Sequence, residues 1–110
     1  MRRPLGKAAI MMFACGGLSD QAGATAEVQL ICDKMKAQAE KKAGRSFNIF
    51  IAKSYKTHAV SGTNYFIKVH VGGEQYVHLC VFKKMPCFGG DQELRGIQYP
   101  KTLQDTIVFF

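Results

Sequence analysis

The stretch GTNYFIKVHVG, residues Gly62–Gly72, decides the fold. Apolar side chains recur in it at alternate positions, namely Tyr65, Ile67, Val69 and Val71. A period of two places these side chains on one face of an extended chain. The stretch therefore predicts a β-strand that has one face buried against a core.

The residues that follow predict an antiparallel partner for this strand. The segment Gly72–Gln75 is a hairpin turn signal. Apolar residues then alternate again, at Val77, Leu79 and Val81. Proline and two glycines in Met85–Gly90 predict a second loop, because proline ends strand pairing. We expect a last strand around Thr106–Phe110.

Upstream, the pattern also indicates extended chain. Residues Phe47, Ile49 and Ile51 alternate, the segment Tyr55–Val60 continues the pattern, and Ser61-Gly62 forms a turn. These segments extend the sheet into an antiparallel meander.

Before the strands, the period changes to that of a helix. Apolar residues form one stripe, at Val28, Ile31, Cys32, Met35 and Ala39. Thr25 suits the N-cap and Gly44 the position after the helix, which gives a helix over Ala26–Ala43. An amphipathic helix must pack on one face of the sheet. The fold class is therefore α+β, with one long helix packed on an antiparallel sheet of four to five strands.

Length and composition set outer limits on function. The chain has 110 residues, 47% of them hydrophobic, which is enough for one small domain. No apolar run is long enough to cross a membrane. The net charge of +7 includes Arg2, Arg3 and Lys7, and without these three it becomes +4. The other basic residues are scattered, so we expect no specific nucleic-acid binding and no membrane partner.

The first residues allow two interpretations. We expect residues 1–14 to be a flexible leader and arm, and residues 15–110 to be the folded domain. In the alternative, residues 1–24 act as a secretion signal, because Ala22-Gly23-Ala24 resembles a cleavage site.

The cysteines and histidines do not indicate a reactive centre. Cys15, Cys32, Cys80 and Cys87 lack the spacing of a zinc site, so we expect reduced thiols and no metal. Cys15, near the start of the chain, could form an intermolecular disulfide on oxidation. A row of His and Lys on the exposed sheet face, including His70 and His78, is expected to be solvated. Without a phosphate loop, a nucleophile elbow or paired carboxylates, the sequence predicts no enzyme and no cofactor.

Strand reversal places two turns at one end of the domain. The turns His58–Gly62 and Met85–Phe88 must share an end, and Gly72–Gln75 must lie at the other. Ala59-Val60-Ser61 and Met85-Pro86 are unusually apolar for turns, which indicates a contact surface. The alternative is that both tips fold back on the core.

The residues quoted above resemble those of a known family. The stretch Gly62–Gly72 is similar to the central run of the stefins, the type 1 cystatins. The match continues through Val77-His78-Leu79, Val81-Phe82, Met85-Pro86 and Ala24-Thr25-Ala26-Glu27, and covers roughly Cys15 to Phe110. The resemblance implies a monomeric, reversible, tight-binding inhibitor of papain-like cysteine proteases such as lysosomal cathepsins. It also implies a cytoplasmic protein without disulfides, whose helix is wrapped by an antiparallel sheet.

The resemblance also implies the protease-binding residues. The family motif Gln-Val-Val-Ala-Gly corresponds to His58-Ala59-Val60-Ser61-Gly62, and the family's Leu-Pro pair to Met85-Pro86. The glycine of the N-terminal arm corresponds to Gly16, or else to Gly17. Together the arm and two loops would form an apolar wedge that occludes the protease cleft.

Departures from the motif leave an alternative open. Ala59 is smaller than valine, Ser61 adds a hydroxyl, and His58 adds a titratable group. We expect affinity to depend on pH between about 5 and 7, where histidine side chains change charge. The alternative is a cystatin-fold interaction module with weak or lost inhibition.

Overall fold

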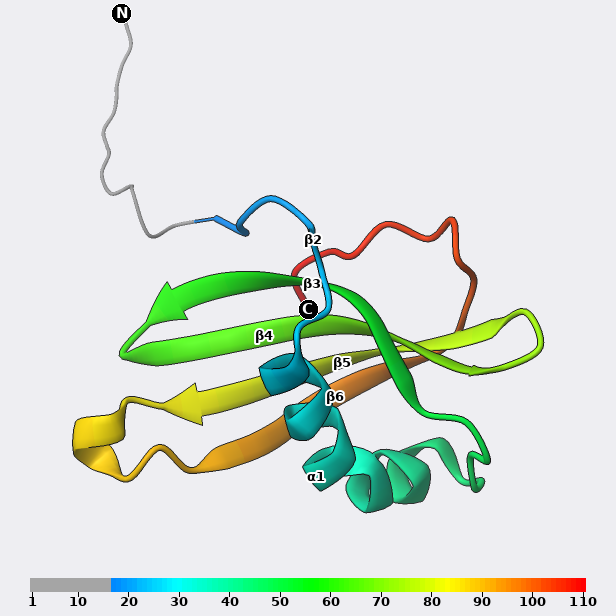
Figure 1. Cartoon of the computed structure of the whole chain (residues 1–110), viewed down its shortest axis with the longest axis horizontal. Helices are drawn as coiled ribbons and strands as arrows, with labels where there is room; N and C mark the ends of the chain where they lie inside the picture. The colour runs from blue at the N-terminus through cyan, green and yellow to red at the C-terminus, as the bar shows by residue number, and fades with distance from the viewer. Residues whose placement is uncertain (1–16) are drawn as a thin grey trace, which may run out of the picture.

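The computed structural model describes residues 17–110. Five antiparallel strands pair in the order β2-β3-β4-β5-β6, so each strand pairs with its neighbour in sequence. Their bounds are β2 Ala22–Gly23, β3 Ile51–Val60, β4 Gly62–Gly72, β5 Gln75–Lys84 and β6 Gln92–Lys101. The expected α+β architecture, one helix packed on an antiparallel sheet, is confirmed (Figure 1).

The helix α1 spans Ala26–Ala43, as its sequence predicts. The Thr25 side chain accepts a hydrogen bond from the amide of Val28, and Gly44 closes the last turn in the left-handed conformation. The predicted apolar stripe is buried, from Val28 to Ala39. No helix in residues 17–110 is long and apolar enough to cross a membrane.

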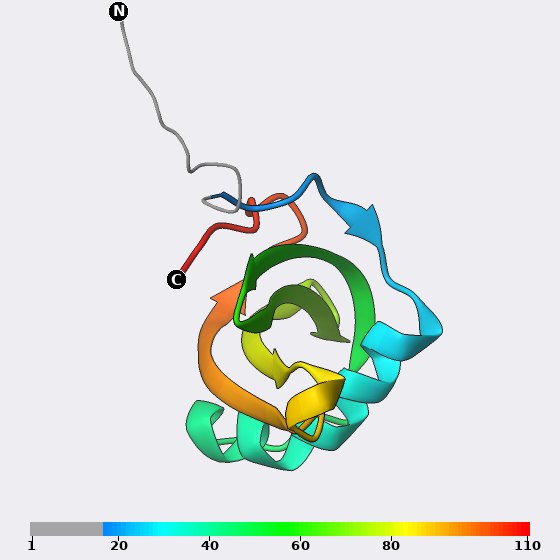
Figure 2. The ribbon, with the colours of Figure 1, turned by 90° about the vertical axis from the view of Figure 1, so that its left-hand side faces the viewer.

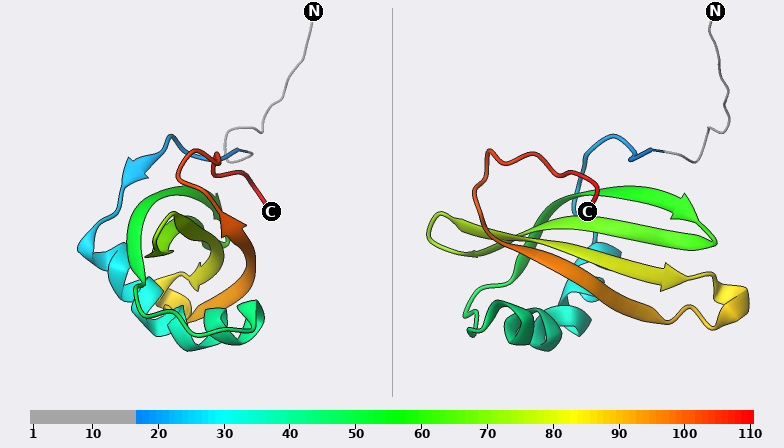
Figure 3. Two further views of the ribbon diagram at one scale, coloured as in Figure 1. Left: turned by 90° about the vertical axis from the view of Figure 1, so that its right-hand side faces the viewer. Right: turned by 180° about the vertical axis from the view of Figure 1, so that it is seen from behind.

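The main core lies between α1 and one face of the sheet. Ile67 and Val69 of β4, and Val77, Leu79 and Val81 of β5, are all fully buried there. The sheet is strongly curled, with α1 along one side and the end of the chain on the other (Figures 2 and 3). An irregularity in the β3–β4 register between Ala52 and Ser54 bends β3 within this curl.

The segment between α1 and β3 corrects one prediction. The alternation of Phe47, Ile49 and Ile51 predicted a strand, but β3 begins only at Ile51. Phe47 and Phe50 are buried instead, while Ile49 and Ile51 are exposed. The cause is the aromatic packing of Phe47, whose ring stacks on Phe50 and meets Tyr99 edge to face.

The end of the chain corrects a second prediction. Thr106–Phe110 is not a strand; the last strand is β6. Residues 102–110 form an irregular segment, called here the C-terminal strap, which runs over the face of the sheet opposite α1 (Figure 2). Strand β6 escaped prediction because a register shift between Leu94 and Gly96 breaks the alternation of its inward residues.

The strap also overturns the expected exposed row of His and Lys. It covers the outer face with a second, smaller core in which Phe66, Cys80 and Ile107 are buried. Beneath it, Lys68 is only 5% exposed and His78 is 0% exposed. A sheet face that the sequence marks as polar is therefore largely enclosed.

Candidate functional site

Two connections lie together at one end of the molecule. Val60, Ser61 and Gly62 join β3 to β4, and the loop after Lys84 joins β5 to β6 (Figure 1, left). Gly62 pairs directly with Lys84 in the β4–β5 ladder, which holds the two connections side by side. The β4–β5 turn lies at the opposite end, as predicted. We call the first pair the two-turn edge.

In the first turn, close packing fixes the backbone at Gly62. This glycine is buried with φ at 155°, and an added Cβ would lie 2.6 Å from the carbonyl oxygen of Lys83. Only glycine fits there without moving a strand. The tip itself points to solvent, since Val60 is 50% exposed and its neighbours Ala59 and Ser61 are also exposed.

His58 lies at the base of this turn and is half-buried. Its ring meets that of Phe109 edge to face, with 5.1 Å between centroids. Its Nδ1 atom is buried without a hydrogen-bond partner among the described residues. The position of the imidazole is therefore set by packing against the C-terminal strap.

The second loop holds its own shape through backbone hydrogen bonds. Pro86–Phe88 forms a single 3-10 turn, η1. The amides of Phe88 and Gly90 both donate to the carbonyl oxygen of Met85, at 2.8 and 3.1 Å. Met85 and Phe88 are exposed, at 43% and 68%. The tips of both loops are therefore apolar and open, and they do not fold back on the core.

Phe88 was not among the residues that the sequence singled out. Together with Ser61, Phe82 and Lys84 it borders a shallow depression on the two-turn edge. A second depression, of about 200 Å³, runs between Gly62 and the pair Met85-Pro86. The sequence signal that could have identified Phe88 is the presence of a bulky aromatic residue two positions after the loop proline.

The segment that leads into the domain approaches the same end. The Ser19 amide donates to the carbonyl oxygen of Thr57 at 2.8 Å, and the Thr57 amide donates to Ser19 Oγ at 2.9 Å. Gly17, two residues earlier, is exposed, and no atom lies within 4 Å of a Cβ placed on it. Gly16 lies outside the described residues.

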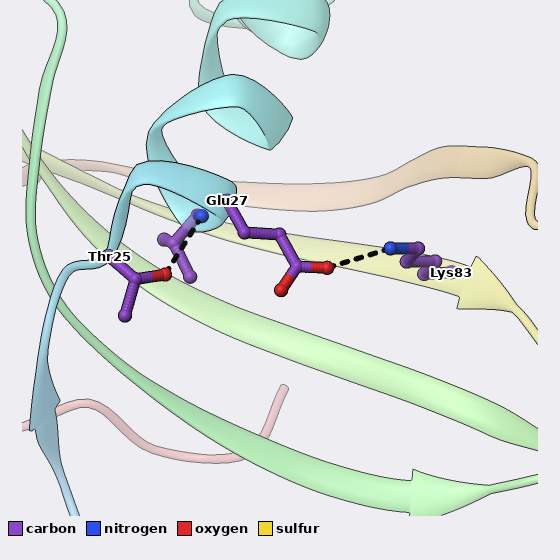
Figure 4. A network of polar contacts seen from close by, with 4 residues as sticks. Thr25, Glu27 and Lys83 are labelled. Atoms are coloured by element: carbon purple, nitrogen blue, oxygen red, sulfur yellow. Dashed lines mark hydrogen bonds and ion pairs between the residues drawn. The ribbon is translucent and has the colours of Figure 1, made fainter.

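An ion pair connects the edge to the helix. Glu27 in the first turn of α1 accepts a hydrogen bond from Lys83 Nζ at 2.8 Å, beside the Thr25 cap (Figure 4). This hydrogen bond raises the pKa of the lysine. A solvent-exposed pair of this kind contributes less than about 1 kcal/mol. The fit of Gly62 against Lys83, rather than this pair, therefore sets the spacing of the two turns.

The described residues of the two-turn edge do not form a metal site. In the described residues no group of histidine, cysteine and carboxylate side chains could hold a metal ion. His70 and His78 do not lie opposite each other, because His78 pairs with Lys68 and His70 pairs with Tyr76. What the two-turn edge offers is two apolar projections of fixed shape, which suit insertion into a partner's cleft.

Comparison with known proteins identifies the class. The family model described as Cystatin domain matches residues 16–103. The Cystatin-B of Oplegnathus fasciatus is 53% identical over 91% of this chain and 100% of its own length. The Cystatin-B of Paralichthys olivaceus is 50% identical over 87% of this chain and 98% of its own. The Cystatin-A1 of Sus scrofa is 44% identical over 86% of this chain and 92% of its own length.

The chain therefore belongs to the cystatin family, whose members inhibit cysteine proteases and are not enzymes. Within this family it is a stefin similar to cystatin B, as the stretch Gly62–Gly72 led us to expect.

Proposed function

We propose that the chain is a reversible, tight-binding inhibitor of papain-like cysteine proteases such as lysosomal cathepsins, and that the two-turn edge enters their active-site cleft. The observation that carries this proposal is the pair of exposed apolar turns held side by side by the Gly62–Lys84 pairing. Because these turns are already ordered, they lose little conformational entropy on binding.

Several of the predicted residues have a defined part in this mechanism. Val60 fills the centre of the cleft and Met85-Pro86 its flank, while Gly62 keeps the two turns close. Gly16 or Gly17 lets the arm bend along the cleft, because glycine tolerates a wide range of backbone angles. The turns block the catalytic residues of the protease without placing a peptide bond for attack, so the inhibitor is not cleaved.

We also propose that the protein acts as a cytoplasmic monomer, with residues 15–110 as the inhibitory domain and residues 1–14 as a leader. Cys32 and Cys80 are buried as free thiols and Cys87 is a free exposed thiol, which suits a reducing compartment. Cys15, the residue proposed to form a dimer on oxidation, lies outside the described residues.

Titration of papain tests the function, and a pair of matched variants tests the site. Val60→Asp places a charge on the first turn, whereas Ile51→Asp places one at the other end of β3. The two side chains are equally accessible, since Ile51 is 48% exposed and Val60 is 50% exposed. Loss of a buried valine side chain costs about 1.5–3 kcal/mol, so Val60→Asp should weaken inhibition at least tenfold. Ile51→Asp should inhibit within about twofold of the wild type.

A second function remains open because His58, Ala59 and Ser61 depart from the family motif in the first turn. The chain would then be an interaction module that keeps the cystatin fold but inhibits weakly. Absence of papain inhibition at micromolar concentration of the wild-type chain would favour this function and reject the first.

A further inference from the structure

The C-terminal strap is held to the sheet by lysine hydrogen bonds, one buried side chain and the rings of Phe109 and Phe110, which pack on Phe66. Lys68 Nζ donates to the carbonyl oxygen of Leu103 at 2.5 Å, and Lys56 Nζ donates to that of Ile107 at 2.9 Å. Ile107 is the one fully buried side chain of the strap, and it packs against Phe66 and Cys80. Because the strap contributes one fully buried side chain, whereas the helix-side core is built from many, the strap should open at a lower free energy than that core.

Beneath this strap lies a fully buried histidine. His78 is 0% exposed, and neither ring nitrogen makes a hydrogen bond of good geometry among the described residues. Its cross-strand neighbour on β6, Gln98, also has a buried side-chain oxygen without a partner among those residues. The charged groups that face it are Lys68 from β4, Lys101 from the end of β6, and Asp105 from the strap itself. Two cations and one anion thus surround an imidazole that is stable here only when it is neutral.

We propose that protonation of His78 at mildly acidic pH releases the C-terminal strap from the outer face of the sheet, while the helix-side core stays folded. Enclosing a charged imidazole beside two lysines costs more free energy than the one neutral acceptor at hand, the side chain of Gln98, can offset. Lifting the strap removes Asp105 and Ile107 from its surroundings and admits water. The switch needs no partner and does not depend on the protease-binding function.

The direction of the pH dependence follows from the two states of the imidazole. Burial and the two lysines lower the pKa of His78 from 6.5 to about 4, and Asp105 and the side chain of Gln98 oppose this only in part. Between these pH values the open form binds a proton that the closed form does not. The open population therefore rises as pH falls, by about twentyfold between pH 7 and pH 5, and levels off below about pH 4.

Three cysteines report separately on the states of the protein. Cys80 is 5% exposed beneath the strap, Cys32 is 0% exposed in the helix-side core, and Cys87 is exposed in the second loop. Release of the strap should uncover Cys80 alone, whereas global unfolding should uncover Cys32 as well. Cys87 reacts in every state and serves as the internal reference.

The experiment measures labelling of the wild-type chain by dithiodipyridine from pH 7 to pH 4, with each site resolved by peptide mass spectrometry. We expect the rate at Cys80, relative to Cys87, to rise about twentyfold between pH 7 and pH 5 while Cys32 stays protected. His78→Leu or His78→Phe, whichever folds, should abolish the rise. His70→Gln removes a half-exposed histidine of the same face and should retain it.

Three results would overturn the proposal. A Cys80 rate that stays constant relative to Cys87 down to pH 4 would show that the strap does not open. Equal rises at Cys80 and Cys32 would show global unfolding in place of strap release. Persistence of the rise in both His78 variants would show that a group other than His78 causes the opening of the strap.

Discussion

Gly62 controls the distance between the two turns. Its Cα faces the carbonyl oxygen of Lys83 and the ring of Phe82, and both would lie under 3 Å from an added Cβ. Because the carbonyl belongs to the backbone of β5, a side chain at position 62 must push β4 away from β5. The same glycine therefore serves the packing of the sheet and the shape of the two-turn edge.

Gly62→Ala should lower the free energy of unfolding by about 1–3 kcal/mol, because overpacking forces the strands apart. It should also weaken papain inhibition, since the turns move relative to each other. Gly23→Ala is the matched control, because a Cβ at Gly23 meets no atom within 4 Å. Urea unfolding curves of both variants measure the difference in their free energies of unfolding. Equal stability of the two variants would show that β5 moves away from the added Cβ at no cost in free energy.

His58 leads to a prediction about the base of the first turn. The ring is half-buried, two residues from Val60, and meets the ring of Phe109 edge to face. His58→Gln removes this aromatic contact, so it should change the inhibition constant for papain. An inhibition constant equal to that of the wild type would contradict the prediction.

At the scale of elements, the N-terminus of α1 carries both a cap and the link to β5. Thr25 Oγ1 accepts the Val28 amide at 3.2 Å, and Glu27 in the same turn binds Lys83. Side-chain capping satisfies a helix amide that would otherwise have no acceptor. The contribution of the cap to stability can be measured apart from binding, because Thr25 lies outside the two-turn edge.

Thr25→Ala should cost about 1 kcal/mol of stability, which is about 5 °C in melting temperature for a domain of this size. Thr25→Ser keeps the hydroxyl acceptor and should melt within about 2 °C of the wild type. Both variants should inhibit papain like the wild type. Calorimetry distinguishes them, and an equal loss in the two variants would exclude capping as the cause.

The sequence predicted those elements whose side chains keep one period throughout. Strands β4 and β5 alternate without interruption over most of their length, and α1 has a complete stripe with both caps. Strand β6 has an extra residue between Leu94 and Gly96, which shifts its inward side chains and hides the alternation. Phe47 and Phe50 are buried at a spacing of three through ring contacts that local patterns do not encode.

At the scale of the molecule, the strap accounts for the largest difference between sequence and structure. Lys68 and His78 are polar residues on the outer face, and a sequence pattern assigns such a face to solvent. The strap encloses them because Ile107, far along the chain, packs on Phe66 and Cys80. Long-range coverage of this kind cannot be derived from alternation.

The location of the candidate site was more accessible to prediction. Reversal of chain direction at each turn requires that the first and third connections share an end, whatever their details. The exposed positions of Val60 and Met85 agree with the predicted contact surface, while Phe88 was added by the structure. Which residues touch a protease remains a prediction that follows from the family motif.

Hydrogen exchange in a complex reports whether the two-turn edge is the surface that binds papain-like proteases. Papain with its catalytic cysteine blocked by a methylthio group can be mixed with the chain without cleavage. If the two-turn edge binds the protease, amide exchange should slow in residues 58–62 and 84–90 and stay unchanged in the Gly72–Gln75 turn at the opposite end. Protection of the Gly72–Gln75 turn alone, or of neither end, would contradict it.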